Sequence, residues 1–388
     1  MGTCPSDNTA ATDQTSFWSQ GSIHWDAHRI GWAVAGACTL VTLLISIFTV
    51  LSHCRNYTKP RQQRQVIRIL YMPPVYAVIS FLSYRFFRAY TYYSFVEVVY
   101  EAITLSAFLL LLIEFVAERA QGKDNILAEK EKRKLIFPFC CWRYRPTKPY
   151  FMHAVKWSVL QYVIVRPSVS LAGIICQALG VLCESQGFDV HFASVYLEAI
   201  DFVSISFALY GLLVFYGLTK DQLQGKKPLA KFLCIKLIVM VTWYQSFVFS
   251  ALQNRVIHET NFWTSTNIAD GLNALAICIE MIFFAIFMSR AYPYNEYKRP
   301  QGTPATSIWR PLWDSINYSD FAQEVISSLA FFLNPKKSTS YVSAHSKAGR
   351  PQAATFDSAF NLNGHNTKER KTSSTSDDIP LSNHPSRV

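Results

Sequence analysis

Seven long apolar stretches are the feature that most constrains the fold of this 388-residue chain. The hydrocarbon core of a bilayer is about 30 Å thick, and a helix needs about 20 apolar residues to cross it. Each stretch reaches that length and is apolar nearly all round, as a helix surrounded by lipid is. Because unpaired backbone groups are costly in lipid, helices are the expected form. The predicted spans are 31–51, 69–88, 95–116, 155–181, 192–218, 232–253 and 264–289.

The Lys and Arg residues between the spans predict their orientation. Segment 117–156 holds ten of them and the region from Arg290 onward holds twelve, whereas segments 89–94 and 182–191 hold none. Basic loops stay on the cytosolic side of a membrane, so the pattern predicts an extracytosolic N terminus and a cytosolic C terminus. These loops also explain the formal net charge of +11. They face an anionic inner leaflet, and the charge therefore does not indicate a nucleic-acid-binding protein.

This arrangement predicts an all-α integral membrane protein, a seven-transmembrane helix bundle, with four regions along the chain. They are a short extracytosolic segment (1–30), the seven-helix transmembrane domain (31–290), a cytosolic segment with an amphipathic helix (291–333) and a disordered, Ser/Thr-rich tail (334–388). The amphipathic helix is predicted over 321–333, behind a capping box of Asp320 and Gln323. It either lies on the inner leaflet, which we favour, or docks on the cytosolic side.

The chain lacks the residue patterns of membrane enzymes. None of its nine His lies clearly within a span, whereas zinc-dependent membrane hydrolases place His and acidic ligands there. The chain also contains no P-loop, no G-x-S-x-G motif and no H-E-x-x-H motif. The seventh span has no Lys for a retinal Schiff base. We therefore expect neither an enzyme nor a bound metal or other cofactor.

Two local features modify this outline. Pro73-Pro74 interrupts the second span, and Pro167 the fourth. Each frees a backbone carbonyl, which is tolerated at mid-depth only where protein or water satisfies it; a plain kink is the alternative.

Cys140 and Cys141 lie beside aromatic residues in the long basic loop. Such juxtamembrane cysteines suit S-acylation, and inert thiols are the alternative.

Polar side chains inside the spans are the main candidates for function, because a charge in the bilayer costs several kcal/mol. Four acids are expected to line an outer acidic vestibule: Glu97, Glu198, Asp201 and Asp270. The other polar residues singled out inside the spans are Glu101, Gln161, Arg166, Lys236, Gln245, Asn273 and Glu280. As a set they favour a polar cavity that binds a solute or relays ions. The alternative, favoured for any single residue, is buried pairs that fix helix packing, such as Arg166 with Glu280.

Several motifs resemble those of one known family over roughly residues 30–330. They are Tyr100-Glu101-Ala102, Val159-Leu-Gln-Tyr-Val-Ile-Val-Arg-Pro167, Lys227-Pro228 with Lys231-Phe232, Lys236 and Trp243-Tyr-Gln245, Cys278-Ile-Glu-Met281, and Trp313-Asp-Ser-Ile-Asn317 followed by Asp320. In this combination the sequence resembles the organic solute transporter alpha-subunit family, particularly the branch called transmembrane protein 184. The resemblance implies seven spans and transport of organic solutes. Animal members of the family carry steroid conjugates and bile acids by facilitated diffusion, together with a single-span beta partner, and the resemblance extends this expectation to the present chain.

The resemblance gives the intramembrane residues candidate roles in a transport path. Arg166 or Lys236 would bind an anionic group, and Gln161 and Gln245 would supply neutral hydrogen bonds. Glu101 and Glu280 would balance the bases in the empty state, and Asn273 completes the set. The leading hypothesis is therefore a carrier for amphipathic, steroid- or lipid-like solutes. The alternative is a seven-span receptor or a scaffold or trafficking protein without transport activity, although the chain has no D-R-Y triplet and no N-P-x-x-Y motif.

We expect this protein in the plasma membrane or in an endomembrane or vacuolar membrane. Its expected partners are membrane lipids and the organic solute, together with further copies of the chain or a single-span subunit. No nucleic acid is expected among them.

Overall fold

The computed structural model describes most of the membrane domain and the segments close to it. The described residues are 18–19, 22–23, 26–86, 90–120, 133–134, 143–144, 149–181, 191–219, 225, 227–252, 256–258, 265–299, 307–319 and 326. The helices are α1 Ala27–Arg55, α2 Pro60–Leu70, α3 Met72–Arg85, α4 Tyr90–Ala120, α5 Pro149–Ala178, α6 Ala193–Thr219, α7 Pro228–Leu252, α8 Ser265–Ala291, the 3₁₀ helix η4 Tyr294–Tyr297 and α9 Trp309–Ile316. Two short antiparallel pairs join β1 Trp18–Ser19 with β2 Ser22–Ile23 and β3 Arg133–Lys134 with β4 Arg143–Tyr144.

The structure confirms the predicted seven-span, all-helical membrane fold. Within the described part of the chain, seven helical segments are long and apolar enough to cross a membrane. Six of them overlap the predicted spans closely. The second begins at Pro60, nine residues before its predicted start, because α2 and α3, separated only at Tyr71, together form this span. The predicted amphipathic helix at 321–333 lies almost entirely outside the described residues, as do Cys140 and Cys141.

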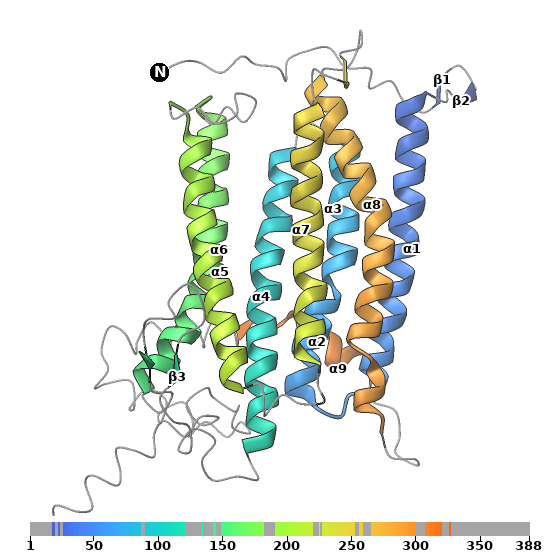
Figure 1. Ribbon diagram of the computed structural model, residues 1–388. Coiled ribbons are helices and arrows are strands. Elements are labelled where there is room, and N and C mark those ends of the chain that lie inside the picture. The colour runs from blue at the N-terminus through green and yellow to red at the C-terminus, as the bar shows by residue number, and fades with distance from the viewer. Residues whose placement is uncertain are drawn as a thin grey trace, which may run out of the picture.

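The helices form a bundle with two differently packed parts (Figure 1). Helices α1, α3 and α8 pack against one another, and α7 packs against α8. Helix α4 contacts α2, α3 and α5, and α6 packs chiefly against α5. In Figure 1, the α5–α6 pair therefore stands at one side of the bundle and α1 at the other. We call the lower end of this view, where α1, α4, α6 and α8 end and the Lys- and Arg-rich loops begin, the basic end.

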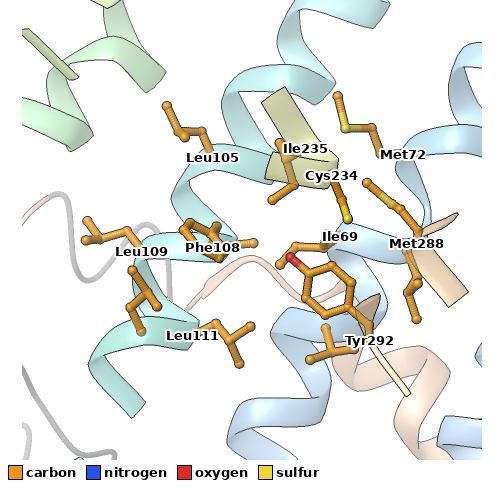
Figure 2. Close-up of a cluster of buried hydrophobic side chains, with 14 of the residues drawn as sticks. Ile69, Met72, Leu105, Phe108, Leu109, Leu111, Cys234, Ile235, Met288 and Tyr292 are labelled. Carbon is orange, nitrogen blue, oxygen red and sulfur yellow. The ribbon is translucent and has the colours of Figure 1, made fainter. Parts of the chain in front are cut away.

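The apolar core is concentrated toward the basic end. Figure 2 shows Ile69, Phe108, Ile235 and Met288 meeting from α2, α4, α7 and α8, with Tyr292 just beyond α8. Toward the opposite end the pattern changes. No described residue of α5 after Val163 is buried, and none of α7 after Ile238 is buried. Helices α5, α6 and α7 are thus held by protein contacts mainly in their halves at the basic end.

Prolines shape the second span but not the fourth. The helix breaks at Tyr71, and Pro73 and Pro74 lie in the first turn of α3, where a missing N–H is tolerated. Helix α5 runs through Pro167 without a break. The predicted break in the second span is therefore confirmed, whereas the fourth span stays helical through its proline. Pro167 removes one backbone hydrogen bond there without ending the helix.

Helix α9 is an element that the sequence reasoning missed. The only helix predicted within segment 291–333 was the one over 321–333, yet the segment also contains α9, which packs against α2. A hydropathy profile does not reveal this helix, because it has only eight residues. Its stability comes from docking on the bundle rather than from its own length.

Candidate functional site

Charged residues from four helices meet in the middle of the membrane. Glu101 of α4 is 4% exposed. Its Oε1 accepts a hydrogen bond of 2.8 Å from the Tyr162 hydroxyl of α5. The same oxygen lies 4.0 Å from Nζ of Lys236 on α7. Arg166 of α5 forms an ion pair with Asp201 of α6 through Nη1 and Oδ2. We call Glu101, Tyr162, Arg166, Asp201 and Lys236 the charge cluster.

The Arg166–Asp201 pair corrects the pairing suggested from the sequence. Arg166 was expected to pair with Glu280 if it had a packing role, but its partner is Asp201 because α6 packs along α5, whereas Glu280 lies on α8. For the same reason, Glu101 and Asp201 balance the two bases, rather than Glu101 and Glu280. Glu280 is half-buried, and its Oε2 has no hydrogen-bond partner among the described residues.

The charge cluster is electrically balanced and lies deep in the bundle. Two bases face two acids, so its formal charge is zero. Lys236 follows the start of α7 by eight residues and Asp201 follows the start of α6 by eight. At 1.5 Å per residue, each lies roughly 12 Å from the end at which its helix begins, and these ends face opposite sides of the membrane. The cluster is thus far from water on both sides of a core about 30 Å thick.

The hydrogen bonding of the cluster is incomplete. Nε of Arg166 and Oδ1 of Asp201 are both buried and have no hydrogen-bond partner in the described part of the chain. An unsatisfied buried polar atom costs about 1–3 kcal/mol. The pair therefore keeps, at a cost, hydrogen-bonding atoms that a contact serving packing alone would have satisfied. The side chains of Arg166, Asp201 and Lys236 are still 26%, 18% and 16% exposed, against 5% for Glu101. Arg166 is therefore the most accessible charge of the cluster, and Glu101 is its most enclosed one.

The candidate amide residues tie neighbouring helices together. Gln161 donates to the Ser204 carbonyl at 2.9 Å, and its own oxygen accepts a bond of 2.9 Å from the Ser204 hydroxyl. These bonds join α5 to α6. Gln245 donates to the carbonyl and to the side-chain oxygen of Asn273 at 3.1 Å each, which joins α7 to α8. Both pairs have the geometry of packing contacts, although Oε1 of Gln245 is buried without a hydrogen-bond partner among the described residues.

The four acids predicted for the outer vestibule come from three helices. Glu198 and Asp201 lie three residues apart on α6, where Glu198 is exposed and Asp201 belongs to the charge cluster. Glu97 of α4 accepts a hydrogen bond of 3.0 Å from Ser80, which ties α4 to α3. Asp270 lies on α8, which stands apart from α6 in the bundle (Figure 1). Asp201 is paired with Arg166, and a vestibule shared by all four acids stays a prediction.

Two tyrosines at the cluster were not among the sequence candidates. Tyr162 is 1% exposed and bonds Glu101 directly. Tyr76 of α3 is 4% exposed and is an electrostatic neighbour of Glu101 and Arg166. A signal existed for Tyr162, because it precedes Arg166 by four residues and hence shares its helix face. No such spacing links Tyr76 to a charged residue of its own helix.

These features define a multi-pass integral membrane protein with a balanced, incompletely satisfied set of charges in its interior. Intramembrane ionisable groups of this kind mark the pathways of transporters. Residues 31–297 match the family described as Organic solute transporter Ostalpha. The match covers more than half of the chain, and the protein belongs to this family. No solved structure matches the chain. Family and fold together point to a membrane transporter.

Proposed function

We propose that the protein carries amphipathic organic solutes across the membrane by facilitated diffusion, and that the charge cluster binds their anionic group. The observation that carries the proposal is the incomplete bonding of Arg166. A guanidinium can bond a carboxylate or sulfate through two parallel N–H groups, and the buried Nε of Arg166 has no hydrogen-bond partner among the described residues. Lys236 supplies a second positive charge, 4.0 Å from its acid.

The acids of the cluster explain how such a site persists without solute. An unpaired Arg or Lys would be very costly at this depth. Asp201 and Glu101 remove this cost in the empty state. An arriving anionic group exchanges with Asp201 at the guanidinium, while Tyr162 keeps Glu101 hydrogen-bonded. Exchange of partners, rather than capture by a bare charge, gives weak and reversible binding, which a facilitated-diffusion carrier needs.

The apolar body of the solute would lie toward the end of the bundle opposite the basic end. There, α6 exposes Tyr196 and Ile200, and α7 exposes Trp243, Tyr244 and Phe247. The Trp243 and Phe247 rings are stacked with centroids 6.4 Å apart. Aromatic faces of this kind supply contact area for a steroid or acyl skeleton. With the orientation predicted from the basic loops, this end faces away from the cytosol, so the closely packed basic end separates the site from the cytosol.

The test is solute flux into phosphatidylcholine proteoliposomes with a radiolabelled steroid sulfate as the probe. We expect saturable flux for the wild type and a loss of at least about tenfold for Arg166→Ala, because one charge-assisted hydrogen bond contributes about 1.5–3 kcal/mol and a factor of ten in a binding constant corresponds to about 1.4 kcal/mol. Arg85→Ala is the matched control, because it removes an Arg at the end of α3 away from the cluster.

Two results would contradict the proposal. Unchanged flux in Arg166→Ala, with a thermal unfolding midpoint close to that of the wild type, would exclude Arg166 from the site. Absence of wild-type flux for steroid sulfates, bile acids and uncharged sterols alike would favour a receptor or scaffold function.

A further inference from the structure

Helix α9 has three distinct faces. Pro311 and Ser315 are buried against the bundle. Trp309, Trp313 and Ile316 are 82%, 75% and 59% exposed although they are apolar, whereas Leu312 is half-buried against the core. The remaining face carries the polar residues Arg310, Asp314 and Asn317.

The angular order of these faces is informative. At 3.6 residues per turn, the two Trp and Ile316 fall within about 60° of one another. The buried face lies on one side of this apolar sector and the polar face on the other. A free surface helix would have only an apolar and a polar face. In α9, by contrast, one face packs on the bundle, and no described protein surface covers the apolar sector.

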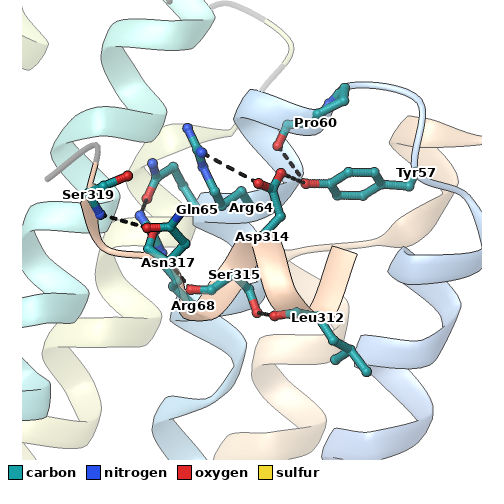
Figure 3. Close-up of polar contacts among 10 residues, drawn as sticks. All are labelled: Tyr57, Pro60, Arg64, Gln65, Arg68, Leu312, Asp314, Ser315, Asn317 and Ser319. Carbon is teal, nitrogen blue, oxygen red and sulfur yellow. Dashed lines mark hydrogen bonds and ion pairs between the residues drawn. The ribbon is translucent and has the colours of Figure 1, made fainter. Parts of the chain in front are cut away.

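Contacts with the second span fix how α9 is rotated (Figure 3). Arg68 of α2 is 1% exposed. It donates from Nε to the Ser315 carbonyl at 2.9 Å and from Nη2 to the Asn317 carbonyl. These carbonyls lie at the negative end of the α9 dipole, which suits a cation. The apolar sector is therefore held outward by buried hydrogen bonds.

A second anchor joins α9 to the turn between α1 and α2. Asp314 accepts a hydrogen bond of 2.8 Å from the Tyr57 hydroxyl and lies 3.8 Å from Nη1 of Arg64. Burial raises the pKa of Tyr57, and the Asp314 carboxylate raises it further. The phenol therefore stays protonated as the donor. The two anchors, Arg68 and Asp314, prevent α9 from turning its Trp side chains inward.

We infer that α9 is a membrane-interface helix, and that the lipid at the basic end of the bundle covers Trp309, Trp313 and Ile316. Three observations favour lipid over a protein partner. In Figure 1, α9 lies beside the lower part of the bundle, above the lower ends of α4 and α8, and so at the level of the membrane boundary. Trp is the residue that prefers this boundary. Arg310, exposed beside the sector, offers a cation to anionic headgroups.

The experiment compares the fluorescence of the full-length wild type with that of a Trp309→Phe/Trp313→Phe variant in phosphatidylcholine–phosphatidylserine vesicles. The difference between them is the emission of the two α9 tryptophans. We expect lipids brominated close to the headgroup to quench this difference signal more strongly than lipids brominated near the chain end. We expect aqueous iodide to quench it weakly.

Trp243→Phe gives the matched control. Trp243 is 63% exposed on α7 and far from either helix end. The vesicles contain no organic solute, so lipid chains contact this side chain and its emission should respond most to bromine near the chain end. Phe keeps each site apolar, and thermal unfolding shows whether the double variant is folded; Trp313→Phe alone serves if it is not. Strong quenching of the α9 signal by iodide, with no effect of bromine, would show that the sector faces water. Protection from both quenchers would show that protein covers it. Either result overturns the inference.

Discussion

The Arg166–Asp201 pair yields the sharpest prediction about the interior of the bundle. Asp201→Asn keeps the shape of the side chain and removes its charge, which leaves Arg166 beside a neutral partner. We expect Asp201→Asn and Arg166→Met to lower the free energy of unfolding each on its own. Together they should lower it by less than the sum, because the second change removes a charge that has already lost its partner.

The expected magnitude follows from the partial burial of the pair. Exposed ion pairs contribute about 0.2–1 kcal/mol, whereas removing one partner of a fully buried pair costs about 3–5 kcal/mol. The two side chains are 26% and 18% exposed, which places them between these limits. One guanidinium nitrogen and one carboxylate oxygen are also unsatisfied, so the pair is weaker than an ideal one. We therefore expect a coupling energy of about 2 kcal/mol.

The coupling energy is measured with a double-mutant cycle, from reversible unfolding of the purified protein in mixed detergent–lipid micelles. Glu280→Gln combined with Arg166→Met gives the control cycle. Glu280 lies on α8 and should couple with Arg166 by less than about 0.5 kcal/mol, the additivity expected of separated sites. A coupling below about 0.5 kcal/mol for Asp201, or an equal coupling for Glu280, would refute the pairing described here.

Three further predictions concern packing and hydrogen bonding. Gly211→Ala should destabilise the bundle by about 1–3 kcal/mol, because the added Cβ would lie 2.9 Å from a side-chain carbon of α5. Gly173→Ala, whose Cβ would make an ordinary van der Waals contact of 3.7 Å with Leu197, should be near neutral in the same unfolding assay. Tyr162→Phe should cost about 1.5–3 kcal/mol, since Glu101 is too buried for water to replace the hydroxyl; a loss below about 0.5 kcal/mol would contradict this bond. Arg68→Met should release α9 and increase protease cleavage around residues 300–320, and unchanged cleavage would argue against the anchor.

The apolar spans were predictable because lipid imposes its own rule on the sequence. A span must be long, apolar and helical, and composition alone reveals that. The start of the second span was not predictable in the same way. Helix α2 buries Gln62, Gln63, Gln65 and Arg68, which hydropathy assigns to a loop. Two of them find partners far along the chain: Gln62 bonds Glu118 of α4, and Arg68 bonds the Ser315 and Asn317 carbonyls almost 250 residues away.

The candidate site shows the same limit at the level of single residues. Sequence could identify Arg166, Lys236 and Glu101 as polar residues inside spans, because each stands out in an apolar run. It could not identify Asp201 as the partner of Arg166, since that depends on which helices are neighbours. Depth alone favoured Glu280, because it placed Asp201 in the outer vestibule. The packing of α6 along α5 decides the question, and this packing rests on close approaches such as that at Gly211.

The position of the charge cluster suggests which part of the proposed carrier moves. On α4, α5 and α7, the described buried residues begin or end near Glu101, Val163 and Ile238, so the cluster lies where close packing gives way to exposed side chains. Below it, the basic end is fixed by the apolar core and by α9. Above it, α5, α6 and α7 have few neighbours to displace. Exchange of Asp201 for the solute anion at Arg166 would therefore take place where small side-chain shifts cost least energy. The cluster would then couple solute binding to movement of the loosely packed half.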